Sequence, residues 1–472
     1  MKTTKGSFLE SYFKLQENHT NVKTEILAGI TTFITMAYII FVNPSILREA
    51  GMNSAGALGN AALRFNVGSD PVVSAVFVAT CLAAAVGTFI MGFYANLPFA
   101  QAPGMGLNAF FTYTVCLTLG YTWHEALAAV LISGILFIII TVTSIREKIV
   151  DAIPQNMKYS ISAGVGLFVA LIGLKVGGII VANSDTLVAF GNLKNAGVIV
   201  TLIGIAATGI LMARKVKGSI LLGIIITSIV GIPLGITQLT NIKVFSLPPS
   251  LAPTFFAFDF HGLFSKAGHN NVGLTGAILS FAMVVITICL VDLFDTIGTL
   301  VGTATKAGMV DENGKVLRMR KALLCDAVAT TAGACMGTST VVTYVESTSG
   351  VSQGGRTGLT SVTVGILFVL SLFFSGIVGL VPAQATAPAL VIVGVLMMGA
   401  VKNIDFDDFT EAMPAFFCIV IMPFTYSIAN GIASAMIIYP IVKLATGRGK
   451  ELHPLVYVLA CLFILRFALL PM

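Results

Sequence analysis

Charged residues are scarce in this sequence of 472 residues. Asp, Glu, Lys and Arg together make up 10% of the chain, whereas 56% of it is hydrophobic. Because soluble domains carry roughly a quarter charged residues, this chain lacks the polar surface that keeps a protein in water. Apolar runs close to the ~20 residues needed to cross a bilayer recur along the whole length. The composition predicts an all-α polytopic membrane protein and argues against a soluble enzyme.

Paired ligand residues are also missing. The five histidines are scattered, and the seven cysteines show no metal-binding or redox spacing and lie mostly in apolar stretches. We therefore expect no metal, no cofactor and no disulfide framework. The formal charge of +6 does not indicate a nucleic-acid partner, because Lys and Arg sit in short clusters between apolar runs. No small-residue cleavage site follows the polar first 24 residues, so we expect a permanent first span and no cleaved signal peptide.

Fourteen apolar segments are expected to cross the membrane. A further apolar piece, 455–470, either lies at the interface or packs as an extra helix. An odd number of spans on each side of the polar stretch 238–271 forces the two halves into opposite orientations, which is the arrangement of an inverted repeat with its substrate near the midplane. The segments run approximately over 26–45, 73–95, 104–118, 124–143, 159–177, 196–213 and 218–236, and then over 272–303, 322–337, 340–353, 357–381, 386–401, 412–429 and 430–446.

This count predicts how the chain is divided. Basic clusters follow even-numbered spans, at 146–158, 214–217, 306–321 and 443–450. The positive-inside rule therefore places the N-terminus in the cytoplasm of a cell membrane. The expected parts are a cytoplasmic N-terminal segment 1–24, a first seven-span repeat 25–237, an extracellular loop 238–271, a second seven-span repeat 272–446 and a C-terminal segment 447–472.

Two short, broken segments stand at matching positions in the two halves. They cover 103–111 and 338–350, and both are too short and too polar to cross alone as lipid-facing helices. Non-helical backbone at that depth is tolerated only against protein or a water-filled cavity. Short broken segments at corresponding positions are also the sequence signal for a transporter's binding site. We therefore expect the site there.

A polar stripe marks the eighth span. Its members recur at spacings of three and four, so they share one face of a helix: Asp292, Asp295, Thr296, Thr299 and Thr303. An ionisable residue at membrane depth is costly enough to be a functional hypothesis by default. This helix is therefore expected to contact the cargo.

Asp295 and Glu346 are the leading candidate pair. Desolvation favours the protonated form of a carboxyl in an apolar cavity, so either group can carry a proton, and an ionised carboxylate accepts two parallel N–H bonds. Alternative roles remain open: Glu346 as a structural acid bonded to amides of the broken helix, and Asp295 in a helix–helix hydrogen bond. Asp292 either supports Asp295 in proton coupling or faces the cytoplasmic mouth.

Further candidates lie in the first, third, eighth and tenth segments. The Asn108 amide supplies the donor and acceptor that a nucleobase edge requires, or else bonds across the helix break. Gly104 and Gly106 permit close backbone approach; no strand precedes them, which argues against a dinucleotide fingerprint. Aromatic rings either stack on a planar ligand or only pack, and Thr299 is a further polar contact. The aromatic candidates are Phe33, Phe110, Phe294 and Tyr344. The acidic cluster at 405–411 is expected to be solvated.

These blocks resemble a known family. NVKTEILAGITTFITMAY at 21–38, GMGLNAFF at 104–111, VDLFDTIGTLVG at 291–302 and TYVESTSGV at 343–351 are similar to the azaguanine-type hypoxanthine/guanine/adenine permeases, a branch of the nucleobase–cation symporter-2 and nucleobase–ascorbate transporters. The resemblance implies a seven-plus-seven inverted repeat. A core domain (spans one to four and eight to eleven) moves against a gate domain (five to seven and twelve to fourteen), and segments three and ten begin with short extended pieces.

The resemblance also assigns roles to single residues. In the uracil permeases the eighth span carries a Glu-His-Ile-Gly-His element, and Asp295-Thr-Ile-Gly-Thr299 stands in what looks like its place, with Asp for the binding Glu and Thr for both His. Glu346 matches the carboxylate of the tenth segment. The family implies a proton as coupling ion and often a homodimer.

The sequence therefore predicts a transporter in the lipid bilayer, and no enzyme, that takes up purine nucleobases with protons by alternating access. Uracil, xanthine or an anion as cargo of the same fold is the alternative, although an anion site favours helix N-termini and basic residues over carboxylates. An intramembrane aspartyl protease is a remote alternative, because the chain lacks a Gly-x-Gly-Asp element.

Overall fold

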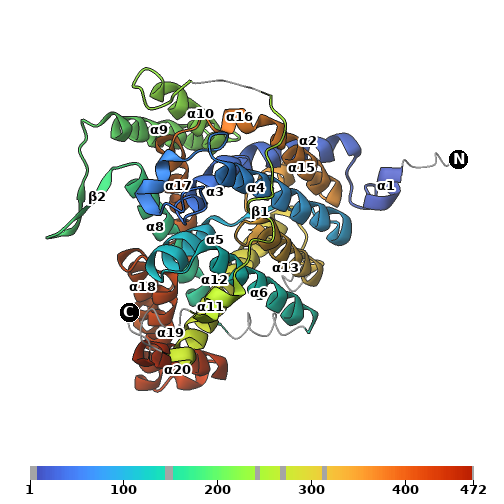
Figure 1. Ribbon diagram of the computed structural model, residues 1–472. Coiled ribbons are helices and arrows are strands. Elements are labelled where there is room, and N and C mark those ends of the chain that lie inside the picture. Colours follow the sequence, from blue (N-terminus) through green and yellow to red (C-terminus); the bar gives the residue numbers. More distant parts are fainter. Residues whose placement is uncertain (1–7, 144–152, 240–244, 266–272, 311–315, 470–472) are drawn as a thin grey trace, which may run out of the picture.

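The computed structural model describes residues 8–143, 153–239, 245–265, 273–310 and 316–469 (Figure 1). Helices dominate these residues, and nine of the described helices are long and apolar enough to cross a membrane. Shorter helices and two broken segments complete fourteen segments, as predicted. The fold class is therefore confirmed: seven segments in each half, with short extended pieces in the third and tenth.

The first half contains seven segments and two smaller elements. A short helix, α1 (Phe8–Phe13), precedes them, and a hairpin of β2 (Ile180–Asn183) and β3 (Leu187–Phe190) follows the fifth. The segments are α2 (Val22–Met36) with α3 (Ile39–Leu47), α4 (Pro71–Ile90) with η2 (Met91–Ala95), β1 (Gln101–Pro103) with α5 (Met105–Ala109) and η3 (Phe110–Thr118), α6 (Trp123–Val142), α8 (Gln155–Val176), α9 (Ala196–Ala213) and α10 (Ser219–Gly231).

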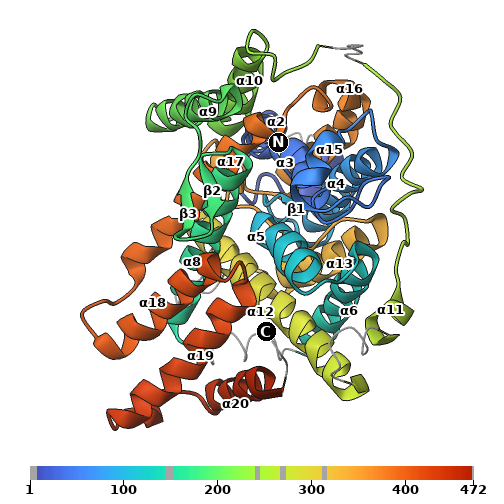
Figure 2. The same ribbon diagram turned by 60° about the vertical axis from the view of Figure 1, so that its left-hand side comes forward.

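The second half repeats this order. A short helix, α11 (Phe260–Ser265), precedes it, at the end of a stretch from residue 245 that passes along one side of the molecule (Figure 2). The segments are α12 (Gly273–Ala307), α13 (Met319–Met336), β4 (Val341–Thr343) with α14 (Ser347–Val351), α15 (Gly358–Ser371) with α16 (Ser375–Val378), α17 (Ala383–Met398) with η6 (Gly399–Asn403), α18 (Phe409–Phe424) and α19 (Ile428–Ala445).

The two broken segments meet in the middle of the molecule. Strand β1 pairs antiparallel with β4, with Ala102 opposite Val342, and all residues of both strands are buried. Beyond the strands, the Gly104 N–H donates to the Thr340 carbonyl (3.0 Å) and the Tyr344 N–H to the Ala100 carbonyl (2.9 Å). Each half thus satisfies the exposed backbone of the other, as buried backbone in a membrane protein requires.

Threonines on the preceding helices hold the two strands in equivalent ways. Thr88 of α4 donates to the Gln101 carbonyl (3.0 Å) and accepts from its N–H (2.9 Å). Thr330 of α13 donates to the Val341 carbonyl (3.0 Å) and accepts from its N–H (3.2 Å). This repeated device is what an inverted repeat predicts.

The helices pack in two groups. Helix α13 packs on α4 and α6, and α15 on α2 and α4, whereas α8 packs on α17 and α18, and α9 on α10 and α17. Small residues allow the close crossing of α8 and α17: a Cβ added to Gly173 would lie 2.9 Å from the Ala387 carbonyl oxygen. The division into a core and a gate domain stays a prediction. The residue boundaries predicted for the repeats and terminal segments stay predictions.

An ion cluster joins the ends of α18 and α19. Lys443, which is 1% exposed, lies 2.8 Å from Glu411 and 2.9 Å from Glu451. Hydrogen bonds from the Thr410 hydroxyl and the Arg448 guanidinium hold the pKa of Asp408 at about 2. The expectation that the acidic cluster 405–411 is merely solvated is therefore wrong for Asp408 and Glu411, because a buried lysine needs their charge. After η7 (Gly449–Glu451), α20 (Pro454–Leu469) packs against α19, as an extra helix.

One buried carboxylate joins the start of α2 to the start of α15 through hydrogen bonds. Glu25, fully buried, accepts hydrogen bonds from the backbone N–H groups of Arg356 (2.8 Å), Thr357 (3.3 Å) and Thr360 (3.2 Å). The Thr360 hydroxyl donates a further bond of 2.6 Å. Orphan N–H groups at a helix N-terminus are thus satisfied by an acid from a distant span.

Replacing Glu25 by glutamine should destabilise the protein by about 2 kcal/mol, because an amide NH₂ in place of one oxygen leaves buried N–H donors without an acceptor. The measurement is the melting temperature of the purified protein in detergent. Glu17→Gln is the control, since Glu17 is exposed and its ion pair with Lys14 (3.0 Å) is an interaction of little stabilising value. Equal melting temperatures for the two variants would contradict the role given to Glu25.

Candidate functional site

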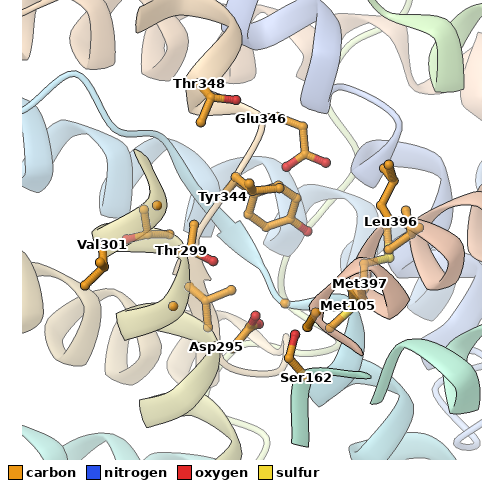
Figure 3. Close-up of a pocket in the computed structure, with 18 of the residues that line it drawn as sticks. Met105, Ser162, Asp295, Thr299, Val301, Tyr344, Glu346, Thr348, Leu396 and Met397 are labelled. Atoms are coloured by element: carbon orange, nitrogen blue, oxygen red, sulfur yellow. The ribbon is translucent and has the colours of Figure 1, made fainter. Parts of the chain in front are cut away.

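A cavity of about 1420 Å³ lies beside the crossing of β1 and β4. Residues from both helix groups line it: α12, the start of α5 and the segment after β4 on one side, and α8 and α17 on the other. Figure 3 shows Asp295, Thr299, Tyr344 and Glu346 around this space, with Ser162, Leu396 and Met397 facing them. The predicted location of the site therefore coincides with a cavity between the two halves.

Helix α12 supplies one acid and one hydroxyl. Asp295 and Thr299 stand one helical turn apart, line the cavity and are partly accessible within it. The other members of the polar stripe turn away. Thr296 and Asp292 are fully buried, and the Thr296 hydroxyl lies 2.9 Å from an oxygen of Asp326 on α13 and 3.3 Å from one of Asp292. Asp292 is thus placed behind the cavity wall, one turn from Thr296.

The segment after β4 supplies the second acid. The chain leaves the strand through Tyr344, whose hydroxyl donates to the Pro103 carbonyl (2.5 Å), so the aromatic ring is held at the crossing. Glu346 then lines the cavity and accepts a 2.6 Å hydrogen bond from the Tyr38 hydroxyl at the start of α3. The Glu346 carboxylate is therefore oriented by the first span.

The two acids come together. Asp295 and Glu346 both point into the cavity in Figure 3, and their charges interact. The charge of Asp326 on α13 also interacts with that of Asp295. Since Asp295 belongs to the eighth segment and Glu346 to the tenth, only tertiary packing brings these carboxylates together.

Strand β1 directly precedes Gly104, so the expectation that no strand precedes the two glycines is wrong; their observed role is close packing. Gly104 and Gly106 line the cavity, and a Cβ on Gly104 would lie 2.9 Å from a methyl carbon of Val342. A Cβ on Gly106 would lie 2.5 Å from a methyl carbon of Val165 on α8. Gly106 therefore marks the point where α5 of one helix group approaches α8 of the other most tightly.

Two other candidates do not line the cavity, and the side chain of a third is not described. Asn108 is fully buried and accepts a hydrogen bond from the Ser339 hydroxyl, so its side chain links the two broken segments. Phe33 packs edge-on against Phe368, with ring centroids 5.2 Å apart. The side chain of Phe294 lies outside the described part of the structure, although its backbone belongs to α12.

Two residues at the site were not predicted. Asp326 is fully buried in α13, and the rule that flagged Asp295, an acid at membrane depth, flags it too. Tyr38 had no such signal, because a tyrosine in an apolar span is usual. Within the described ranges no group of three or more His, Cys, Asp or Glu residues is arranged to hold a metal ion.

Basic residues surround the outer part of the cavity. Lys215 and Lys217, in the exposed turn after α9, line its edge together with Arg318 and Lys158. The cavity thus runs from two carboxylates at its inner end to cations at its mouth.

Comparison with known proteins agrees with this arrangement. The model of a permease family matches residues 23–434. The chain is 43% identical to the adenine permease AdeP of Escherichia coli over 98% of its own length and 97% of that protein, and 42% identical to the guanine/hypoxanthine permease PbuG of Bacillus subtilis over 98% and 100%. The transmembrane domain of a cyanobacterial bicarbonate transporter, BicA, shares the fold with a TM-score of 0.58 at 14% identity, covering 88% of this chain and 97% of that one.

Gly106→Ala should lower the melting temperature, because the added methyl group meets Val165 and overpacking of this kind costs about 1–3 kcal/mol. Gly209→Ala on α9 is the matched control: nothing lies within 4 Å of a Cβ there, so only the favourable change in helix propensity remains. If the two variants have the same melting temperature, Gly106 does not mark a tight contact.

Proposed function

The chain belongs to the permease family that includes adenine and guanine/hypoxanthine permeases, and from this premise we propose that it takes up purine nucleobases with protons by alternating access. One observation carries the proposal: Asp295 and Glu346, from separate segments, face one cavity beside the crossing of the two halves. That the chain is a transmembrane permease and not an enzyme follows from the family itself.

The lining suits a flat, hydrogen-bonding ring. An ionised carboxylate accepts two parallel N–H bonds, which matches the adjacent donors of guanine, whereas adenine requires a protonated acid or an amide at the same place. The Tyr344 ring is held at the cavity wall by the bond from its hydroxyl to Pro103, and Met105 and Met397 add apolar surface. Thr299 is a further polar contact in this proposal.

Proton coupling is proposed for the same carboxyls. Two acids that face each other repel when both are ionised, and a proton on either one removes the repulsion. Asp292 and Asp326, joined through the Thr296 hydroxyl behind the cavity wall, extend the acidic system away from the cargo. In this scheme the coupling proton enters the cavity and leaves it with the base.

The direction of access follows from charge. The mouth of the cavity is surrounded by Lys158, Lys215, Lys217 and Arg318. By the positive-inside rule we assign this face and the N-terminus to the cytoplasm, so in the proposed cycle the cavity opens inward. The core group would then carry the acids past α8 and α17. The tight contact of Gly106 with α8 would be part of the sliding surface. A homodimer is proposed from the family expectation alone.

Other cargoes of the same fold are less well supported. The related bicarbonate transporter shows the fold alone, and two carboxylates in the cavity repel an anion. Uracil or xanthine would use the same carboxylates, so competition experiments are needed to distinguish them from adenine, guanine and hypoxanthine.

Glu346→Gln and Asp295→Asn should each abolish concentrative uptake of radiolabelled hypoxanthine or adenine, and weaken equilibrium binding of the base about 10- to 100-fold, because each loses a charge-assisted hydrogen bond. Uptake is measured in proteoliposomes with an imposed proton gradient, and binding in detergent by calorimetry. Glu17→Gln and Asp185→Asn are matched controls on exposed carboxylates far from the cavity. Full uptake by both cavity variants would refute the site.

The cargo class is tested by competition. Unlabelled guanine, hypoxanthine and adenine should each reduce uptake of the labelled base, whereas uracil and bicarbonate should leave it unchanged, because uracil lacks the second ring of a purine and the two carboxylates repel an anion. Competition by bicarbonate, with none by purines, would favour the anion alternative.

A further inference from the structure

A second cluster of charged residues lies at the far end of α8, with Arg48 and Glu49 buried and Lys175 exposed. Lys158, near the start of this helix, lines the cavity mouth, whereas Lys175 stands near its end. Their separation of 17 positions corresponds to about 25 Å along the helix. The residues around Lys175 do not line the cavity, so this cluster belongs to the opposite face of the protein.

Glu49 is the acid of this cluster. It follows α3 by two residues, and both Glu49 and its neighbour Arg48 are 3% exposed. The Arg48 guanidinium is engaged elsewhere: it donates to the Phe65 carbonyl (2.9 Å), to the Asn66 side chain (2.5 Å) and to Ser45 (3.3 Å). Among the residues that the structure describes, Glu49 forms no salt bridge within 4.0 Å.

The groups that face Glu49 come from both helix groups. Arg48 lies on its own segment and the Tyr113 hydroxyl on η3, while Lys175 comes from α8 and Tyr426 from the turn between α18 and α19. The Lys175 ammonium lies 5.0 Å from the centroid of the Tyr426 ring. Glu49 therefore sits at a junction of the core and gate groups.

The junction is closed around this acid. The Phe168 ring of α8 packs edge-on against Tyr113, with centroids 6.5 Å apart, and against Tyr426 at 5.9 Å. The Thr114 hydroxyl of η3 donates to the Tyr426 carbonyl (3.2 Å). On this face the two groups are in contact, whereas on the other face the cavity separates them.

We propose that Glu49 is a proton-binding site, distinct from the cargo cavity, and that the proton it holds keeps the core and gate groups closed on this face. An ionised carboxylate buried without an ion pair is costly. Parting of the two groups would admit water and relieve that cost. The inference rests on the proposed alternating access, and it does not depend on the identity of the cargo.

The titration of Glu49 agrees with this geometry. Glu49 lies beyond the first membrane span, which ends at Leu47. Burial raises its pKa from 4.5 to about 7, against the opposing effects of Arg48, Tyr113 and Lys175. When the junction opens and water reaches the carboxyl, the pKa returns toward its ordinary value. The closed state therefore binds the proton more tightly, and between these two values a fall in pH favours closure.

The size of the effect follows from the two pKa values. With a pKa of about 7 closed and 4.5 open, lowering the pH from about 7.5 to about 5.5 shifts the ratio of closed to open protein roughly twentyfold toward closed. Because Glu49 does not line the cavity, its proton is not the one that accompanies the cargo. Acid on this face would hold the inward-facing state.

The test measures opening directly. Thr114→Cys is introduced into a variant in which all seven native cysteines are replaced, and the protein is placed in lipid nanodiscs. Thr114 is 1% exposed here, so a charged methanethiosulfonate reagent reaches it only when the junction parts. Ser184→Cys, in the exposed β2–β3 hairpin after α8, reports the reactivity of a free thiol at each pH. The ratio of the two labelling rates removes the pH dependence of the thiol itself.

The ratio should rise roughly twentyfold between pH 5.5 and 7.5 when Glu49 is present. With Glu49→Gln it should stay low and equal at both pH values, because the amide imitates the protonated acid. A ratio that does not change with pH in the presence of Glu49, or that still rises in Glu49→Gln, overturns the proposal.

Lys175→Met is a second, independent test in case Glu49→Gln does not fold. Since Lys175 opposes the rise in the pKa of Glu49, its removal should move the midpoint of the labelling curve to higher pH. An unchanged or lower midpoint contradicts the electrostatic contact. The labelling involves no cargo, so failure of purine uptake and failure of this closure are observed separately.

Discussion

The structure depends on the pairing of two pieces of extended backbone inside the membrane. Strands β1 and β4 each interrupt a spanning segment and would alone expose unsatisfied amides in a region without water. Their antiparallel pairing, with the flanking bonds of Gly104 and Tyr344 and the threonines at positions 88 and 330, satisfies those groups. Neither half can form this crossing without the other, so the inverted repeat and the crossing are one feature.

The chemistry of the cavity follows from the crossing. Because each broken segment stops short of a full span, space remains beyond it for polar side chains, and the segment after β4 delivers Glu346 to the same space that α12 reaches with Asp295. The Tyr38 hydroxyl and the Asp326 carboxylate lie against these acids from two further segments. The family to which the chain belongs and this converging acid pair are the basis of the proposed transport of a nucleobase.

Much of the fold was predictable because the membrane restricts it strongly. Segment length, the odd count per half and the two polar interruptions follow from hydrophobicity and backbone hydrogen bonding, and each was found as predicted. The direction of individual side chains was harder to predict from the sequence. A helical stripe specifies a face only to within a turn, so Asp295 enters the cavity while Asp292, three residues earlier, turns to Thr296 and Asp326. The Asn108 amide was placed correctly along the chain, but its contact with Ser339 depends on a segment 231 residues away.

The sequence by itself determined that this is a fourteen-segment membrane protein with two broken segments, because burial of apolar length and of backbone amides is a local cost that each segment meets in its own composition. Only the tertiary structure decided which acids meet, which tyrosine orients Glu346, and that Glu49 lies near Lys175 and Tyr426 at the closed face. Those contacts join residues from different segments, and their free energies arise only when the segments pack.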